Sequence, residues 1–236
     1  MRPNKSTTAA AAWVLAAAVY FVAEAISASA FPGYSYATNY ISDLGVPDVG
    51  PFQGRIIDSP LHLVMNAAFI VHGVLFAIAA VLATAGSRTA SARWFRVLAV
   101  VHGVGMVLVG SFHGSQSAVE SGLAVLHVAG AALAILGGNA AAVVAGAVLL
   151  RRAGGAGRES GTRRGVRRWI GTASVVLGIA GVVGLVMLEV DSGSSSIDLL
   201  PDGVWERVAV YAVLAWDLLA GITLLRTRRS VVEARA

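Results

Sequence analysis

The sequence contains no cysteine, which excludes disulfides, iron–sulfur clusters, thiolate zinc sites and cysteine nucleophiles. It is also poor in charge, with 13% charged and 56% hydrophobic residues among its 236. An ordinary soluble domain has about 25% charged residues, so this composition cannot cover the surface of a water-soluble globule. Lys5 is the only lysine, while arginine and alanine are abundant. This bias indicates a GC-rich bacterial genome. Together with the low charge and high hydrophobicity, it predicts a multi-pass protein of the bacterial plasma membrane.

Six apolar stretches are long enough to cross a membrane, since a hydrocarbon core of about 30 Å needs roughly 20 apolar residues per helix. They cover residues 9–30, 59–84, 94–113, 121–150, 169–188 and 204–225. We therefore expect an all-α fold, a polytopic bundle of six transmembrane helices that forms one integral membrane domain over residues 1–236. The basic start, the apolar run and the small residues Ala28, Ser29 and Ala30 are also typical of a cleavable signal peptide, so cleavage stays an alternative.

Positive charge is concentrated on one side of these six stretches. Sixteen of the 18 arginine and lysine residues flank the ends that lie together with both termini, and only Arg55 and Arg207 fall on the other side. By the positive-inside rule both termini are cytoplasmic, residues 151–168 form a basic cytoplasmic loop and residues 31–58 form an exofacial loop. The basic residues then serve orientation and contact with anionic lipid, so we expect membrane lipids as partners and no nucleic acid.

Four ionisable residues lie deep in the expected spans: Glu24, His72, His102 and Asp217. The helical rise places both histidines near the midplane, each in a Val-His-Gly triplet. One interpretation is a neutral imidazole that is hydrogen-bonded across a close helix contact, which the glycine makes possible. The alternative is a proton relay through all four residues, because ionisable groups inside a membrane commonly serve transport.

A second set of polar residues falls in the loop 31–58 or near the exofacial ends of the spans. Because four different spans contribute residues at a similar depth, and the aromatic segment 31–45 can cover them, we predict one polar cavity that opens toward the outer leaflet. Its candidate residues are Asn39, Ser42, Asp43, His62, Asn66, His113, His127, Glu206 and Arg207.

Three functions are compatible with these residues. The first is a lipid-binding protein or scaffold with the outward-facing cavity. The second is a membrane-embedded hydrolase or transferase, in which carboxylates and neutral histidines bind a divalent metal that activates water against a lipid ester or phosphoester. The third is a proton-coupled transporter. The sequence specifies no catalytic residue and no cofactor, and a metal belongs to the second hypothesis alone.

Glu206 and Arg207 are neighbours on the last span, but their side chains point about 100° apart around a helix. They cannot simply neutralise each other, so each needs a partner of its own. We expect Glu206 to meet a donor from the first outer loop or the fourth span, with Asn39 and His127 as the leading candidates. We expect Arg207 to reach Asp43 or a lipid phosphate.

Several of these residues belong to motifs that resemble a known family. The motifs are Tyr34-Ser35 with Asn39-x-Ile41-Ser42-Asp43-Leu44-Gly45, Asn66-x-x-Phe69-x-x-x-Gly73, Gly105-x-x-x-x-Gly110-x-Phe112, His127 with Gly130 and Gly138-Asn139, and Gly203-x-x-Glu206-Arg207 with Trp216. Together they resemble the domain of unknown function 998, a family of roughly six-span bacterial and archaeal membrane proteins. The resemblance implies a six-span fold and a membrane location, but it does not indicate an activity. His113-Gly114 departs from the acidic or proline-containing turn expected after the third motif.

The expected topology can be tested by labelling in intact cells. A cysteine introduced by Ser160→Cys lies in the cytoplasmic loop and resists an impermeant thiol reagent, whereas one introduced by Asp48→Cys lies outside and reacts. The absence of native cysteine removes background labelling. The reverse pattern of labelling would contradict the orientation of all six helices.

Overall fold

The computed structural model describes residues 4–155, 161–193 and 199–233, with six long helices. They are α1 (Lys5–Ala30), α2 (His62–Ala83), α3 (Ala90–Ser111), α5 (Ala124–Gly155), α6 (Gly161–Gly193) and α7 (Asp202–Glu233). Each contains a segment that is long and apolar enough to cross a membrane. The all-α fold expected from the sequence is confirmed.

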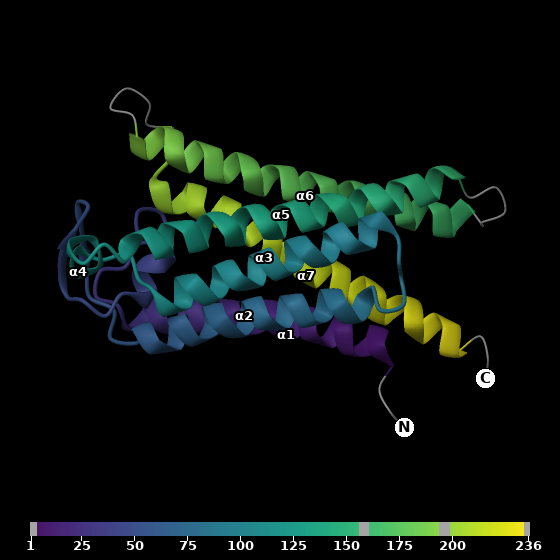
Figure 1. The fold of residues 1–236 in the computed structure, drawn as a ribbon, viewed down its shortest axis with the longest axis horizontal. Helices are drawn as coiled ribbons and strands as arrows, with labels where there is room; N and C mark the ends of the chain where they lie inside the picture. The colour runs from purple at the N-terminus through teal and green to yellow at the C-terminus, as the bar shows by residue number, and fades with distance from the viewer. Residues whose placement is uncertain (1–3, 156–160, 194–198, 234–236) are drawn as a thin grey trace.

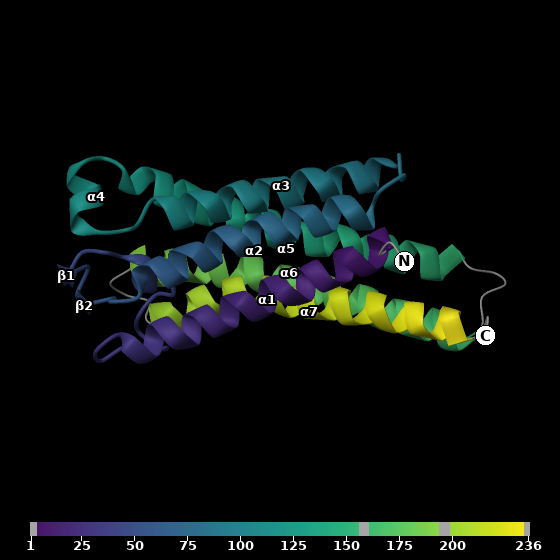
Figure 2. The ribbon, with the colours of Figure 1, turned by 90° about the horizontal axis from the view of Figure 1, so that it is seen from below.

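The start of α1 and the end of α7 lie at the same end of the bundle, which we call the terminal end (Figure 1). The opposite end, called the loop end, carries the smaller elements (Figure 2). These are the 3₁₀ helix η1 (Ser42–Gly45), the antiparallel strands β1 (Gly50–Phe52) and β2 (Arg55–Ile57), and α4 (Gln116–Glu120). Gln53 and Gly54 join the strands, both with positive φ, as a tight two-residue hairpin requires.

The basic loop expected at residues 151–168 is shorter than its arginines suggested. Helix α5 continues to Gly155 and α6 already begins at Gly161, while residues 156–160, which include Ser160, lie outside the described part of the chain. Arginine is a good helix former, so both helices extend in helical form beyond their apolar sections. The expected exofacial loop 31–58 contains η1 and the hairpin instead of irregular chain alone.

Neighbouring helices close into a ring in the order α1, α2, α3, α5, α6, α7 and back to α1. The contact between α2 and α3 is very close at the two Val-His-Gly triplets. A Cβ atom on Gly73 would lie 3.0 Å from the carbonyl oxygen of Gly103, and a Cβ on Gly103 would lie 2.9 Å from that of Gly73. Only glycine permits this approach, as in other membrane helix pairs.

Two apolar clusters fill the interior of the ring. The cluster toward the loop end contains, among others, Tyr20, Ile41, Leu44, Met65, Phe69 and Leu214. The cluster toward the terminal end is built around the rings of Trp13, Phe76, Phe95 and Trp216. On α2, His72 lies between Phe69 of the first cluster and Phe76 of the second, so a layer of ionisable side chains separates the two.

The close contact of α2 with α3 predicts that Gly103→Ala destabilises the bundle. The added methyl group pushes against the Gly73 carbonyl, which is part of the α2 backbone and cannot rotate away, so we expect a loss of about 1–3 kcal/mol in the free energy of unfolding. Unfolding in mixed detergent micelles measures the loss. The matched control is Gly165→Ala on α6, where nothing lies within 4 Å of the new Cβ. Equal effects of the two substitutions would contradict the packing.

Candidate functional site

A chain of hydrogen bonds crosses the middle of the bundle through Asp217, His72 and His102, which we call the histidine chain. His72 Nε2 lies 3.0 Å from Asp217 Oδ2, and His102 Nε2 lies 3.4 Å from His72 Nδ1. His102 Nδ1 lies 2.7 Å from the carbonyl oxygen of Ala134 on α5. All three side chains are buried. The sequence predicted a hydrogen bond across a close helix contact at a glycine without naming the partners, and the structure joins the two histidines to each other.

The fourth member of the predicted relay, Glu24, does not join the histidine chain. It lies closer to the loop end on α1, where its carboxylate accepts hydrogen bonds from the Tyr211 hydroxyl at 2.9 Å and from Arg207 Nη2 at 3.2 Å. Helix α7 therefore binds two different helices at two depths. Asp217 binds α2 in the middle of the bundle, while Arg207 and Tyr211 bind α1 nearer the loop end. A relay through all four residues would need a further link that no hydrogen bond of the described residues supplies.

At the loop end, Arg207 holds the first loop, residues 31–61 between α1 and α2, against the bundle. Its Nη1 donates to the carbonyl oxygens of Tyr36 at 2.6 Å, Asn39 at 2.9 Å and Gly203 at 3.0 Å. Its Nη2 reaches the Tyr34 hydroxyl at 2.5 Å as well as Glu24. The expected contact of Arg207 with Asp43 is wrong, because loop carbonyls, a phenol and a carboxylate from α1 surround the guanidinium instead.

Arg55, which was not among the residues predicted from the sequence for this site, is the partner of Asp43. Its Nε lies 2.9 Å from Asp43 Oδ2 and its Nη2 lies 3.3 Å from Oδ1. Asp43 also accepts from the backbone N–H of Tyr40 and the side chain of Asn39. The β1–β2 hairpin folds back over η1 and brings Arg55 there. The outer location of Arg55 was a signal in the sequence. Arginine is rare on that side of this protein, so its presence there indicated an interaction that requires its charge.

Glu206 accepts hydrogen bonds from the backbone N–H groups of Ile41 and, at 3.4 Å, Ser42. Its carboxylate thus lies at the N-terminus of η1, where free backbone donors favour a negative charge. The expectation of a donor from the first outer loop is correct, but Asn39 and His127 are not the donors. Backbone groups carry no residue-type signal, so the sequence could not name them.

Burial changes the ionisation of two tyrosines in the first loop. It raises the pKa of Tyr34, and the neighbouring Arg207 guanidinium offsets only part of this effect. It also raises the pKa of Tyr40, whose hydroxyl donates to Asp202 at 2.9 Å and is further held in its protonated form by that carboxylate. Both phenols therefore keep their protons and serve as donors at any physiological pH.

The remaining candidates bind elsewhere at the loop end. Asn66 supports the end of η1 by donating to the Gly45 carbonyl at 2.8 Å. The other three are histidines with local partners: His62 with the Ser59 carbonyl, His113 with the Ser115 hydroxyl and His127 with the Phe112 carbonyl. No hydrogen bond of the described residues connects these histidines to Glu206. Nor do the described residues contain three His, Asp or Glu side chains grouped as a metal site.

We use the name polar cap for the side chains that do converge, namely Glu24, Tyr34, Asn39, Asp43, Arg55, Glu206 and Arg207. They are bound to one another and to the backbone of the first loop, and Asp43 and Asn39 are only 2% and 6% exposed. The predicted outward-facing cavity stays a prediction. Ser42 contributes its backbone N–H to this arrangement.

A cleft of about 700 Å³ lies at the terminal end, far from the polar cap. Its deep part is aromatic, and its rim carries hydroxyl and guanidinium groups. The residues that matter most here are Trp13, Phe95, Trp216, Ser174, Arg152 and Arg163. Trp216 Nε1 donates to Ser174 Oγ at 3.1 Å, while the buried Nε1 of Trp13 has no partner among the described residues. None of the nine candidate cavity residues lines this cleft.

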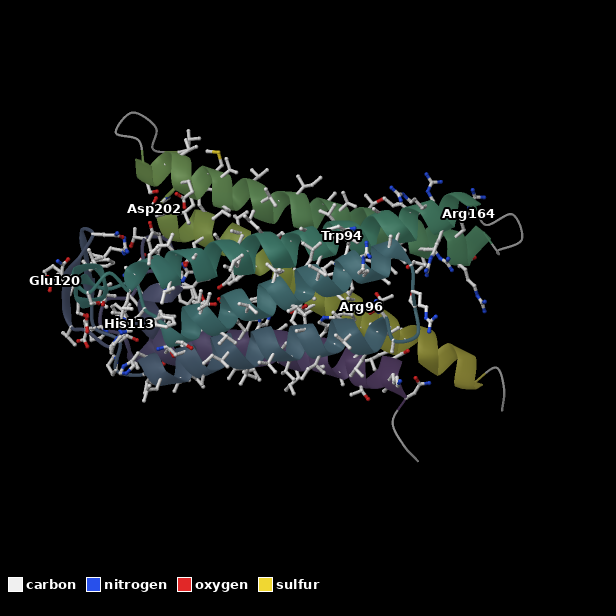
Figure 3. The ribbon with its side chains drawn as sticks, in the orientation of Figure 1. Trp94, Arg96, His113, Glu120, Arg164 and Asp202 are labelled. Carbon is white, nitrogen blue, oxygen red and sulfur yellow. The ribbon has the colours of Figure 1, made fainter. Side chains whose placement is uncertain are left out.

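The two ends of the bundle also differ in charge. Figure 3 shows Glu120, Asp202 and His113 at the loop end and Arg164 at the terminal end. In the sequence the terminal-end arginines are explained by orientation in the membrane and contact with anionic lipid, and nothing there indicates a cleft. Nothing in the spacing of Arg152 and Arg163, eleven residues apart on two different helices, indicates that they border one opening.

The ring of six membrane-length helices with buried ionisable groups defines a multi-pass integral membrane protein. A family model described as "protein of unknown function (DUF998)" matches residues 14–223, and the chain belongs to this family. The resemblance seen in the sequence motifs is thereby confirmed. No curated protein and no solved structure matches the chain.

The polar cap predicts which pairs of side chains depend on each other. Arg207→Gln and Glu24→Gln should each destabilise the protein, and their combination should deviate from additivity by about 0.5–3 kcal/mol, because the two groups are paired in a buried place. The control is Arg55→Gln with the same Glu24→Gln, a combination without a shared partner that should be additive. Unfolding of the single and double variants in mixed micelles gives both cycles. Additivity in the first cycle would show that Arg207 does not depend on Glu24.

Proposed function

We propose that the protein is a lipid-binding membrane protein whose site is the cleft at the terminal end. The single observation that carries this proposal is an apolar, aromatic cleft of about 700 Å³ with arginines at its rim. That volume falls in the range of small-molecule sites. An apolar wall suits acyl chains, and a guanidinium binds phosphate oxygens in a bidentate manner. The ligand class is therefore a lipid with a phosphate headgroup, held headgroup outward.

The shape of the helix ring supports entry of a lipid from the membrane at the terminal end. Helix α7 diverges from α5 and α6 toward the terminal end, where the cleft lies (Figure 1). The positive-inside rule assigns this end to the cytoplasmic leaflet, which is rich in anionic lipids. The proposal thus moves the lipid site from the expected outer face to the opposite one. The buried, mutually bonded side chains of the polar cap fit a structural role at the outer face.

The enzyme hypothesis has less support from the geometry. It needs carboxylates and histidines that converge on one metal, whereas His62, His113 and His127 each bind a local partner. The lipid-binding hypothesis needs only the cleft and its rim, both formed by residues that the structure describes.

The lipid site can be tested by native mass spectrometry of the protein in mild detergent, with added phosphatidylglycerol, phosphatidylcholine or inorganic phosphate. We expect retention of phosphatidylglycerol, and at least tenfold weaker retention by a variant with Arg152→Gln and Arg163→Gln, because each lost charged hydrogen bond is worth about 1.5–3 kcal/mol. Inorganic phosphate should not displace the lipid, since it gains nothing from the apolar wall.

The matched control is a variant with Arg164→Gln and Arg168→Gln, which removes the same charge from α6 at residues that do not line the cleft. It should retain phosphatidylglycerol like the unmodified protein. Equal losses in both double variants would mean that net charge alone attracts lipid, and would contradict a site in the cleft. Displacement of the lipid by inorganic phosphate would reduce the site to an anion site.

A further inference from the structure

The hydrogen bonds of the histidine chain have a direction that the Ala134 carbonyl fixes. A carbonyl oxygen only accepts, so His102 Nδ1 must carry a proton and donate it across the 2.7 Å link. The other nitrogen of a neutral His102 then accepts. His72 must therefore donate from Nδ1 across the 3.4 Å link between the two rings.

The last link, between His72 Nε2 and Asp217 Oδ2, also needs one proton between its two atoms. If His72 is neutral, Nε2 has none to give, and the proton must come from Asp217. The three links of the chain together require three protons. Two neutral imidazoles supply only two, so the intact chain holds one proton more than two neutral histidines and an ionised aspartate.

The surroundings favour Asp217 as the holder of that extra proton. Its second oxygen, Oδ1, is buried without a hydrogen-bond partner among the described residues. A protonated carboxyl leaves only a neutral carbonyl oxygen unpaired there, whereas an ionised one leaves part of a charge unpaired and requires a buried imidazolium beside it. Both charges are far more costly to bury than the neutral pair.

We propose that Asp217, His72 and His102 form a proton-binding site in the middle of the membrane, and that Asp217 carries the bound proton in the folded protein. This site is independent of the lipid cleft and needs no lipid to be filled. The cleft and the proton site are close neighbours, however. Trp216 lines the cleft, and Phe76 packs against both Trp216, at 5.8 Å between ring centroids, and His102, at 4.4 Å.

The groups that face the site are few. From α1 the ring of Tyr20 packs edge-on against His72 at 5.4 Å between centroids, and Glu24 follows one turn further toward the loop end. Helix α5 contributes the Ala134 carbonyl, and Ser174 on α6 binds Trp216, the neighbour of Asp217. On α7, Tyr211 and Arg207 lie more than one turn away. The ion pairs of the described residues give Asp217 no partner besides His72.

The bound proton makes stability depend on pH in a stated direction. Above about pH 7.5 an unfolded chain holds two protons on these three residues, one on each neutral histidine, because a free aspartate ionises near pH 4. The folded protein holds three. Folding thus takes up one proton, and the folding equilibrium constant falls tenfold per pH unit as pH rises, up to the pH at which the folded site releases its proton.

The experiment compares the unmodified protein with two variants, each of which replaces one aspartate by asparagine. In Asp217→Asn the amide donates to His72 Nε2, so the hydrogen-bond chain survives without the titratable proton. In the control, Asp58→Asn, the same change is made in the loop before α2, outside the bundle interior. Reversible unfolding in mixed micelles is measured at several pH values between about 7.5 and 9.

We expect the folding equilibrium constants of the unmodified protein and of Asp58→Asn to fall with pH more steeply than that of Asp217→Asn, by tenfold per pH unit. Differences from all other groups cancel in this comparison. Parallel pH profiles of the three proteins would overturn the proposal.

A second measurement needs no variant and decides the matter if Asp217→Asn does not fold. Infrared spectra of the folded protein near pH 8, with and without ¹³C-labelled aspartate, should contain a carboxylic acid carbonyl band that moves on labelling. Only a protonated aspartate gives such a band, and a solvated aspartate is ionised at this pH. The other buried aspartates, Asp43 and Asp191, accept hydrogen bonds from Arg55 and Trp205, which favour the ionised form. Its absence would show that Asp217 carries no proton and would overturn the assignment.

Discussion

Arg207 is a charged residue inside a helix of membrane length, and its guanidinium must find polar partners because the lipid hydrocarbon offers none. The first loop supplies most of them as backbone carbonyls, and Glu24 supplies the counter-charge from α1. This requirement explains why a loop of more than thirty residues folds compactly over one end of the bundle. Glu206, one residue earlier, binds the backbone amides of η1 and fixes the other side of the same loop. Two adjacent residues of α7 thus organise the loop end.

The middle of the bundle is subject to the same constraint at a greater depth. His72, His102 and Asp217 come from three helices and satisfy one another in a row that ends on a backbone carbonyl. The row can form because Gly73 and Gly103 allow α2 and α3 to approach so closely that their histidines meet. A polar network in an apolar interior stabilises a protein only when its members are satisfied. Asp217 Oδ1, which has no hydrogen-bond partner among the described residues, is the point at which a bound proton lowers the cost of burial.

The two ends of the molecule therefore have different characters. The loop end is closed by bonded side chains of the polar cap, while the terminal end opens into a cleft with arginines at its rim. Trp216 and Asp217 occupy successive positions of α7, about 100° apart around the helix, so the cleft and the histidine chain lie on neighbouring faces of the same turn. A ligand that moved Trp216 would act on the helix segment that holds the proton site. One short stretch of α7 therefore contributes to both proposed sites, with Trp216 in the lipid cleft and Asp217 in the proton site.

The sequence alone determined the class of the protein, because hydrophobic length and the distribution of arginine are read one residue at a time. Six apolar stretches predicted six helices, the Val-His-Gly triplets predicted a close helix contact, and the motifs around Asn39 and Glu206 indicated the family. Only the tertiary structure decided the partners. Asp43 pairs with Arg55 because a hairpin turns back, Glu206 binds backbone amides that have no residue type, and the cleft arises where helices diverge. Spacing along a helix fixes the depth and direction of a side chain, but which helices are neighbours depends on the packing of the whole ring.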